Sequence, residues 1–233
     1  FANFATSRVL DQVRQSIAYS NKNVKIAASH AGLTLGEDGA THQVLEDIGQ
    51  MKMLPGMVVI NPCDYNQTKQ ATLAAAEYEG PVYLRFGRLA TPVINNNESY
   101  KFEIGKGVTL REGSDITIIA TGLMVAASLE AAQMLSADGI QAKVINIHTI
   151  KPLDDELVIS AAKSTKKIIT VEEHSIIGGL GSAVCDVLSA TVPTLVQKIG
   201  MYDMFGESGP AVELLKKYRL DAQGIYEQIK EQL

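Results

Sequence analysis

The sequence has no tryptophan, two cysteines, no block of basic residues and no apolar run long enough to span a membrane. Cys63 and Cys185 lie far apart and lack metal-ligand spacing, which is typical of free thiols in a reducing compartment such as the cytoplasm. A net charge of -5 argues against nucleic acid as a partner. The chain also lacks a secretory signal and begins at Phe1, inside what resembles a structured element, which indicates a fragment of a longer protein.

What the sequence does contain is an ordinary globular balance, with 46% hydrophobic and 20% charged residues. Apolar runs of strand type alternate with segments of helical periodicity, which predicts an α/β fold whose mostly parallel sheets are flanked by helices. We expect strands at 24–28, 57–60, 81–86, 115–120, 143–147, 167–171 and 196–199. We expect helices at 5–19, 42–53, 64–79, 123–138, from 154 or 155, after 181, and at 211–217 and 222–232.

The alternation is interrupted at residues 89–103. This stretch has no helical periodicity, and it contains Pro92 and the three asparagines Asn95–Asn97. We therefore predict two domains, at residues 1–90 and 104–233, with a linker at 91–103.

The loop Ser29–Gln43 concentrates polar residues and glycines. Two of the four histidines of the chain, His30 and His42, bracket it, and three glycines and Asp38 lie between them. Glycines let a backbone fold back on itself or approach a ligand closely. Imidazoles and a carboxylate beside such a bend can bind a polyhydroxylated or phosphorylated substrate and transfer protons near neutral pH. A solvated turn is the alternative, and the combination favours a functional loop.

Two arginines follow the strand expected at 81–86. Arg88 should emerge at the carboxyl end of this strand, where a guanidinium is well suited to bind phosphate through two hydrogen bonds. Arg85 lies within the strand, and alternation points it away from Phe86. A surface ion pair is the other interpretation of these arginines.

Two further features allow alternatives. Phe1 and Phe4 share one helix face, where they can fill a core or form the wall of a pocket for a flat ring, and spacing alone favours the core. The cluster Gly178-Gly-Leu-Gly181 precedes a helix and can cradle a phosphate, but a close strand–helix junction fits its context better. Glu172, Glu173 and His174 are expected in a turn at the end of the preceding strand, in a structural or catalytic role.

Six stretches of the sequence match one known pattern. They are Phe1-Ala-Asn-Phe-Ala-Thr-Ser-Arg8 with Asp11-Gln-Val-Arg14, Gly36-Glu-Asp-Gly-Ala-Thr-His-Gln43, Gly80-Pro-Val-Tyr-Leu-Arg-Phe-Gly-Arg88, Thr149-Ile-Lys-Pro-Leu-Asp154, Val171-Glu-Glu-His-Ser175 with Gly178–Gly181, and Phe205-Gly-Glu-Ser-Gly209. Together they resemble transketolase. The first three are similar to its pyrimidine-binding domain without the first strands, and the last three to its carboxy-terminal domain. The whole looks most like the carboxy-terminal subunit of a split transketolase.

The resemblance implies transfer of a two-carbon ketol unit between sugar phosphates with thiamine diphosphate and a divalent metal such as Mg. Phe4, with Phe1 beside it, is then expected to stack on the aminopyrimidine ring. His30 and Arg88 are expected to bind the substrate phosphate, Asp38 a substrate hydroxyl, and His42 is expected to assist proton transfer.

The same resemblance implies that the active site is incomplete in this chain. The family's activating glutamate and its motif for metal and diphosphate have no match here, so the resemblance implies no metal-binding residue in this chain. It implies an amino-terminal partner, in a homodimer or heterotetramer. The alternatives are deoxyxylulose-phosphate synthase, the beta subunit of a 2-oxoacid dehydrogenase, and an assembly module without catalysis.

Overall fold

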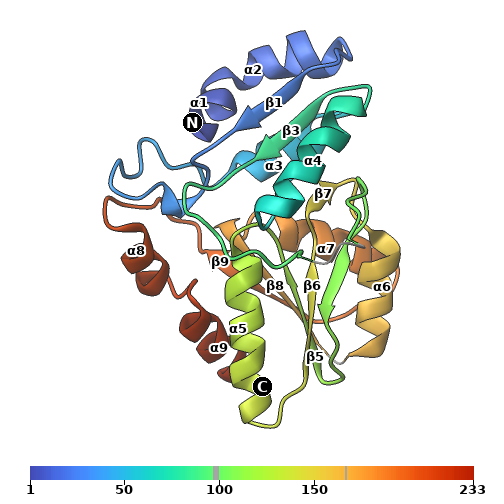
Figure 1. Ribbon diagram of the computed structural model, residues 1–233, viewed down its shortest axis with the longest axis vertical. Helices are drawn as coiled ribbons and strands as arrows, with labels where there is room; N and C mark the ends of the chain where they lie inside the picture. The colour runs from blue at the N-terminus through green and yellow to red at the C-terminus, as the bar shows by residue number, and fades with distance from the viewer. Residues whose placement is uncertain (97–99, 166) are drawn as a thin grey trace.

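The computed structural model describes residues 1–96, 100–165 and 167–233, and two sheets organise them (Figure 1). The first sheet has the strand order β1-β3-β2-β7. Its parallel members β1, β3 and β2 each end at the same edge, and β7 pairs with β2 in the antiparallel direction. The bounds are β1 (Lys25–Ala28), β2 (Val58–Ile60), β3 (Val82–Arg85) and β7 (Thr149–Lys151).

The second sheet has the order β4-β6-β5-β8-β9 and is parallel except for the edge strand β4. Its strands are β4 (Val108–Arg111), β5 (Ile116–Ala120), β6 (Ala142–Asn146), β8 (Ile168–Ser175) and β9 (Val196–Met201). Two mostly parallel sheets flanked by helices are the predicted fold class, which is confirmed.

Three differences from the predicted strands concern pairing rather than composition. Neither β4 nor β7 was expected, because each is short and its place depends on an antiparallel partner distant in sequence. Strand β8 extends to Ser175 because its last residue pairs with Met201 of β9. Glu172, Glu173 and His174 therefore lie within a strand, and their expected place in a turn is wrong.

The helices of the first half follow the prediction with local departures. The segment expected at 5–19 begins at Ala2 and is divided into short turns of different helix type. The predicted helix at 42–53 begins only at Asp47, because the backbone before it is used elsewhere: the Leu45 carbonyl accepts from the Ser175 N–H at 2.7 Å. The bounds are α1 (Ala2–Ala5), η1 (Ser7–Val9), α2 (Leu10–Gln12), η2 (Val13–Tyr19), α3 (Asp47–Met53) and α4 (Tyr65–Glu77). Asp64 caps α4 as expected, accepting from the Gln67 N–H.

The helices of the second half form two layers around the second sheet. Figure 1 shows α5 and α9 on one face of that sheet, with α6 and α7 on the other side. Their bounds are α5 (Met124–Ala137), α6 (Asp155–Ser164), α7 (Leu180–Ala190), α8 (Ala211–Lys217) and α9 (Ala222–Lys230). None of the helices in the described ranges is both long and apolar enough to cross a membrane.

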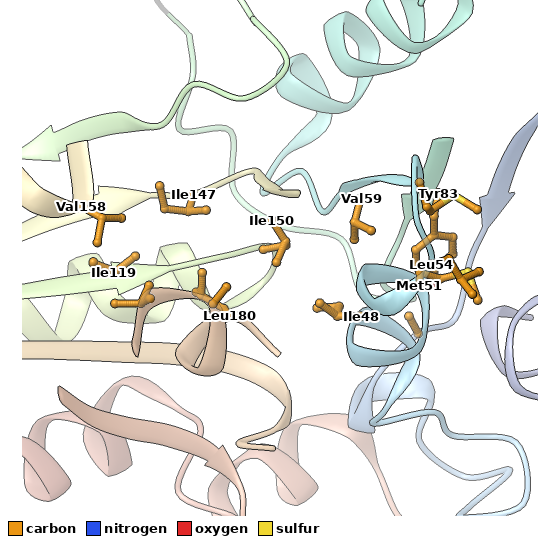
Figure 2. Close-up of a cluster of buried hydrophobic side chains, with 14 of the residues drawn as sticks. Ile48, Met51, Leu54, Val59, Tyr83, Ile119, Ile147, Ile150, Val158 and Leu180 are labelled. Carbon is orange, nitrogen blue, oxygen red and sulfur yellow. The ribbon is translucent and has the colours of Figure 1, made fainter. Parts of the chain in front are cut away.

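One hydrophobic cluster joins the two sheets (Figure 2). It includes Met51 and Val59 from the first half and Ile119 and Leu180 from the second, with Ile150 of β7 between them. Such shared burial fixes how the two halves lie relative to each other. The predicted division at 91–103 stays a prediction, and residues 97–99 of that stretch lie outside the described residues.

Candidate functional site

The loop Ser29–Gln43 leaves the carboxyl end of β1, at the edge where open α/β sheets place their ligands. Its one regular element is the short 3-10 helix η3 (Leu33–Leu35). Gly32, Gly36 and Gly39 all have positive φ, at 86°, 87° and 74°. L-residues with a side chain adopt this backbone region only at a cost, so the course of the loop requires glycine at these places.

The glycines also let the loop approach the second half of the chain. A Cβ on Gly32 would lie 2.5 Å from the Glu173 side chain, and one on Gly39 would overlap the Ser208 hydroxyl. A Cβ on Gly36 would lie 3.3 Å from the Gly209 carbonyl oxygen. The glycines were expected to let the backbone fold back on itself or approach a ligand closely. The structure shows the first use, together with close packing of the loop against the second half of the chain.

Four of the six predicted site residues form one aromatic group. The Phe1 ring lies 4.6 Å from that of His30 and 5.7 Å from that of Phe4, and the Phe4 ring lies 5.2 Å from that of His42. The Arg8 guanidinium covers the Phe4 ring at 4.0 Å. Phe1 is 47% exposed, so the pair does not fill a core, which is the role that spacing alone favoured. The structure instead gives a partly exposed apolar wall beside two imidazoles.

Arg88 and Asp38 lie at another part of the loop. The Arg88 guanidinium donates to the Leu35 carbonyl oxygen at 2.5 Å and forms an ion pair with Glu37 at 3.2 Å. A pocket of about 240 Å³ adjoins this pair and is closed on one side by residues 210–212 of the second half. Asp38 is exposed in the turn that follows Gly36. Both charged side chains thus face outward, but the structure shows no direct contact between Arg88 and the aromatic group in the described residues.

Arg85 has a structural role. It is buried and pairs with Asp47 at 2.8 Å, which also accepts from the Tyr83 hydroxyl at 2.6 Å. A second guanidinium nitrogen donates to the Glu173 carbonyl oxygen at 3.0 Å. Burial, the largest single influence, raises the pKa of Asp47, but Arg85 and His174 together with the hydrogen bonds from Arg85 and Tyr83 outweigh it, so this pKa is lowered. The pair of Arg85 with Asp47 is buried, so it is not the surface ion pair that the sequence suggested.

The cluster Gly178–Gly181 is a strand–helix junction that holds an internal carboxylate. Glu172 accepts from the Leu180 N–H at 2.7 Å and from the Gly181 N–H at 2.8 Å, at the start of α7. A Cβ on Gly179 would overlap the Glu172 carboxylate. Glu172 thus takes two N–H groups of this helix N-terminus, as a phosphate would. The neighbouring His174 is buried and accepts from the Gly49 N–H at 3.3 Å, which makes it structural.

Two residues that hold the loop were not among the predicted site residues. Gln43 was part of the loop motif, and Glu173 belonged to an acidic pair. The structure shows that both bind the loop backbone: Gln43 Nε2 donates to the Leu33 carbonyl oxygen at 3.0 Å, and Glu173 Oε1 accepts from the Thr34 N–H at 2.5 Å. The only signal in the sequence was indirect, since a loop with three glycines indicates close contacts without naming the partner.

The aromatic wall fits a flat heteroaromatic ring better than a charged group. Phe1 and Phe4 supply ring faces and edges, which suit stacking. By contrast, in residues 1–96, 100–165 and 167–233 no three His, Cys, Asp or Glu side chains gather as a metal site would need. The described residues therefore fit the ring end of an aromatic cofactor.

Comparison with known proteins gives two family matches. Residues 1–93 match the model of the transketolase pyrimidine-binding domain, and residues 105–225 match that of the transketolase C-terminal domain. A Methanocaldococcus jannaschii protein, named as a transketolase C-terminal section, is 48% identical over 235 positions, covering all of this chain and 73% of the relative.

One solved structure and one more distant relative extend the comparison. A split-gene transketolase, described as an inactive beta4 tetramer, superposes with a TM-score of 0.92 at 47% identity, covering 99% of this chain and 74% of that one. The 1-deoxy-D-xylulose-5-phosphate synthase of Heliobacterium modesticaldum is 39% identical over 220 positions, but the match covers only 34% of that protein. Similarity in both length and domain content is greater to the split transketolases.

Proposed function

The chain belongs to the transketolase family as a carboxy-terminal section, and from this premise we propose that it supplies the substrate side of the active site in a two-part enzyme. That enzyme moves a two-carbon ketol unit between sugar phosphates. The observation that carries the proposal is the group of Phe1, Phe4, His30 and His42 at the carboxyl end of β1, with Asp38 and Arg88 on and beside the same loop. These side chains suit an anionic polyol next to a flat ring.

The roles divide by chemistry. His30 and Arg88 would bind the phosphate of the sugar, since both can donate to an anion. Asp38 would accept from a substrate hydroxyl and so help to select configuration. His42 lies against Phe4, where it would be next to the reacting carbonyl and could transfer a proton.

Thiamine diphosphate is the cofactor that the family implies. When bound, it supplies the nucleophilic carbon that takes up the two-carbon unit. Phe4 and Phe1 would hold its aminopyrimidine ring, which fits the exposed ring edges described above. The diphosphate, the divalent metal such as Mg and the activating glutamate would be held by the amino-terminal part, so that activity requires both parts. We place the assembly, a homodimer or heterotetramer, in the cytoplasm and its reaction in pentose phosphate metabolism.

The competing assignments differ in their substrates. A deoxyxylulose-phosphate synthase or a 2-oxoacid dehydrogenase subunit would use pyruvate or another 2-oxoacid, whereas a transketolase uses a ketose phosphate. The Gly36–Gln43 stretch favours transketolase. A non-catalytic assembly module would have no need for two imidazoles, a carboxylate and an arginine around one loop.

The first prediction tests this function directly. The chain is combined with an amino-terminal transketolase section, and ketol transfer is measured with xylulose phosphate and, separately, with pyruvate as the donor. We expect activity with xylulose phosphate that requires both parts, thiamine diphosphate and magnesium. The chain alone should bind thiamine diphosphate weakly or not at all in calorimetry, because stacking on one aromatic ring adds only about 0.5–1.5 kcal/mol beyond burial. Pyruvate-specific turnover, or ketol transfer by the chain alone, would contradict the assignment.

A further inference from the structure

The loop Ser29–Gln43 is held in place by contacts with the second half of the chain. Besides the three glycines that pack against Glu173 and residues 208–209, two buried side chains fasten the loop by hydrogen bonds. We propose that Gln43 and Glu173 are positioning residues, through which the carboxy-terminal half sets the places of His30, Asp38 and His42. The catalytic part of this inference rests on the proposed function, whereas its structural part does not.

Gln43 binds three backbone carbonyl oxygens with one amide group. Its Nε2 donates to the Leu33 carbonyl oxygen at 3.0 Å, to that of Gly36 at 3.4 Å and to that of Glu207 at 3.0 Å. The first two acceptors lie inside the loop and the third lies in the second half. The side chain is 5% exposed, and a Cβ on Gly206 would overlap its oxygen. Since His42 directly precedes Gln43 in the chain, a movement of this amide moves that imidazole.

Glu173 fastens the other side of the loop. Its Oε1 accepts from the Thr34 N–H, while the backbone carbonyl of the same residue accepts from the buried Arg85. Burial raises the pKa of Glu173, and the adjacent Arg85 charge offsets only part of this effect. Strand β8 is thereby linked to β3 and to the loop at one residue. Gly32 has no side chain and so leaves the space that the Glu173 carboxylate fills.

The contacts of Gln43 and Glu173 explain why the loop does not need its other polar side chains to hold its backbone. The Leu33, Gly36 and Thr34 backbone groups are satisfied by Gln43 and Glu173, so His30, Asp38 and His42 are not needed to hold the loop and stay available to a ligand. A small displacement of catalytic groups can cost about 100-fold in rate, which gives the positioning contacts a measurable effect on turnover.

The test uses the assembled two-part enzyme with the variant Gln43→Met, which keeps the length of the side chain and removes its donor. We expect kcat to fall about 10- to 100-fold, more than the KM of the phosphorylated donor rises, because His42 directly precedes Gln43, whereas Arg88 lies outside the loop Ser29–Gln43. The matched control is Glu207→Ala. It deletes the carboxylate that pairs with Lys217 and Tyr218 but leaves the carbonyl to which Gln43 donates, so kcat should stay within about twofold.

A second measurement separates this inference from the proposed function. Amide hydrogen exchange of the chain by itself should be faster across residues 29–43 in Gln43→Met and in Glu173→Met, which removes the oxygen that accepts from the Thr34 N–H, with the amides of β5 unchanged. Unchanged loop exchange in both variants would overturn the positioning role. Faster loop exchange with an unaltered kcat would overturn its link to catalysis. If the wild-type assembly had no ketol transfer, the proposed function would fail, and the exchange result would still decide whether these residues hold the loop.

Discussion

The two glycine-rich segments of this molecule, residues 32–39 and residues 178–181, look alike in sequence and differ in what they do with charge. At residues 178–181 the glycines make room for Glu172, whose carboxylate takes the free N–H groups at the start of α7. At residues 32–39 the glycines make room for the other half of the chain, and the charged residues Glu37 and Asp38 stay exposed.

The histidines divide in the same way. His30 and His42 lie beside the loop in a partly exposed aromatic group, whereas His148 and His174 of the second half are buried. The comparison teaches that a polar side chain can mark a ligand site only where it stays accessible. His174 is enclosed with Glu172 and the Gly49 N–H, whereas His30 and His42 contact the hydroxyls of their neighbours Ser29 and Thr41 and remain partly exposed.

The largest expected effect is a loss of stability when the Glu172 carboxylate is removed from the segment at residues 178–181. In Glu172→Ala, two buried N–H groups lose a charged acceptor, and each such bond contributes about 1.5–3 kcal/mol. We expect the free energy of unfolding to fall by about 3–5 kcal/mol in urea denaturation. The matched variant in the open segment, Glu37→Ala, removes a side chain that is 65% exposed and should cost less than about 0.5 kcal/mol. Similar losses in both variants would remove the distinction between the two segments.

The dependence of stability on pH tests whether the buried His148 resists protonation in the folded protein. Burial lowers the pKa of His148 to about 4, and the nearby Asp154 offsets only part of this. The unfolded chain, with an ordinary histidine pKa of about 6.5, binds the proton first as the pH falls. The stability that the neutral His148 contributes is therefore complete above about pH 6.5 and is lost between about pH 6.5 and pH 4, by about 3 kcal/mol in total.

The measurement for His148 is the difference in unfolding free energy between the wild type and His148→Gln across this pH range. The wild type should lose about 3 kcal/mol of unfolding free energy relative to His148→Gln as the pH falls from 7 to 4. Because both proteins share all other titrating groups, a difference that stays constant would show that His148 is protonated as easily in the folded state as in the unfolded one. The Phe102 ring, 4.3 Å from the imidazole, would then not shield it as the structure indicates.

The smallest expected effect concerns Arg88, the partner of Glu37 in the segment at residues 32–39. Arg88→Ala in the assembled enzyme should raise the KM of phosphorylated donors about 10- to 100-fold, the effect of one lost charge-assisted hydrogen bond of about 1.5–3 kcal/mol. Donors without a phosphate should be affected far less. Equal losses for the two kinds of donor would remove the phosphate role and leave Arg88 as the partner of Glu37 alone.

Much of the fold could be predicted from local pattern. The strands that became β2, β3, β5 and β6 are apolar runs buried on both faces, and the Asp64 cap of α4 is a local hydrogen bond. The elements that were missed depend on distant partners. Strand β7 exists because Val59 and Ile60 lie beside it, and α3 begins late because Ser175 takes the Leu45 carbonyl. Sequence spacing carries no information about such pairings.

The candidate site divides along the same line. The sequence by itself determined that a loop with two histidines, acids and glycines leaves the first strand, because residue types and order are local facts. Only the tertiary structure decided that Phe1 and Phe4 form an exposed wall rather than a core, that Arg85 is buried while Arg88 is not, and that the loop glycines face Glu173, Ser208 and Gly209. The physical reason is that burial and hydrogen-bond partners are set by segments distant in the chain, 38 residues apart for Arg85 and Asp47 and 139 for Thr34 and Glu173, which meet only when the chain folds.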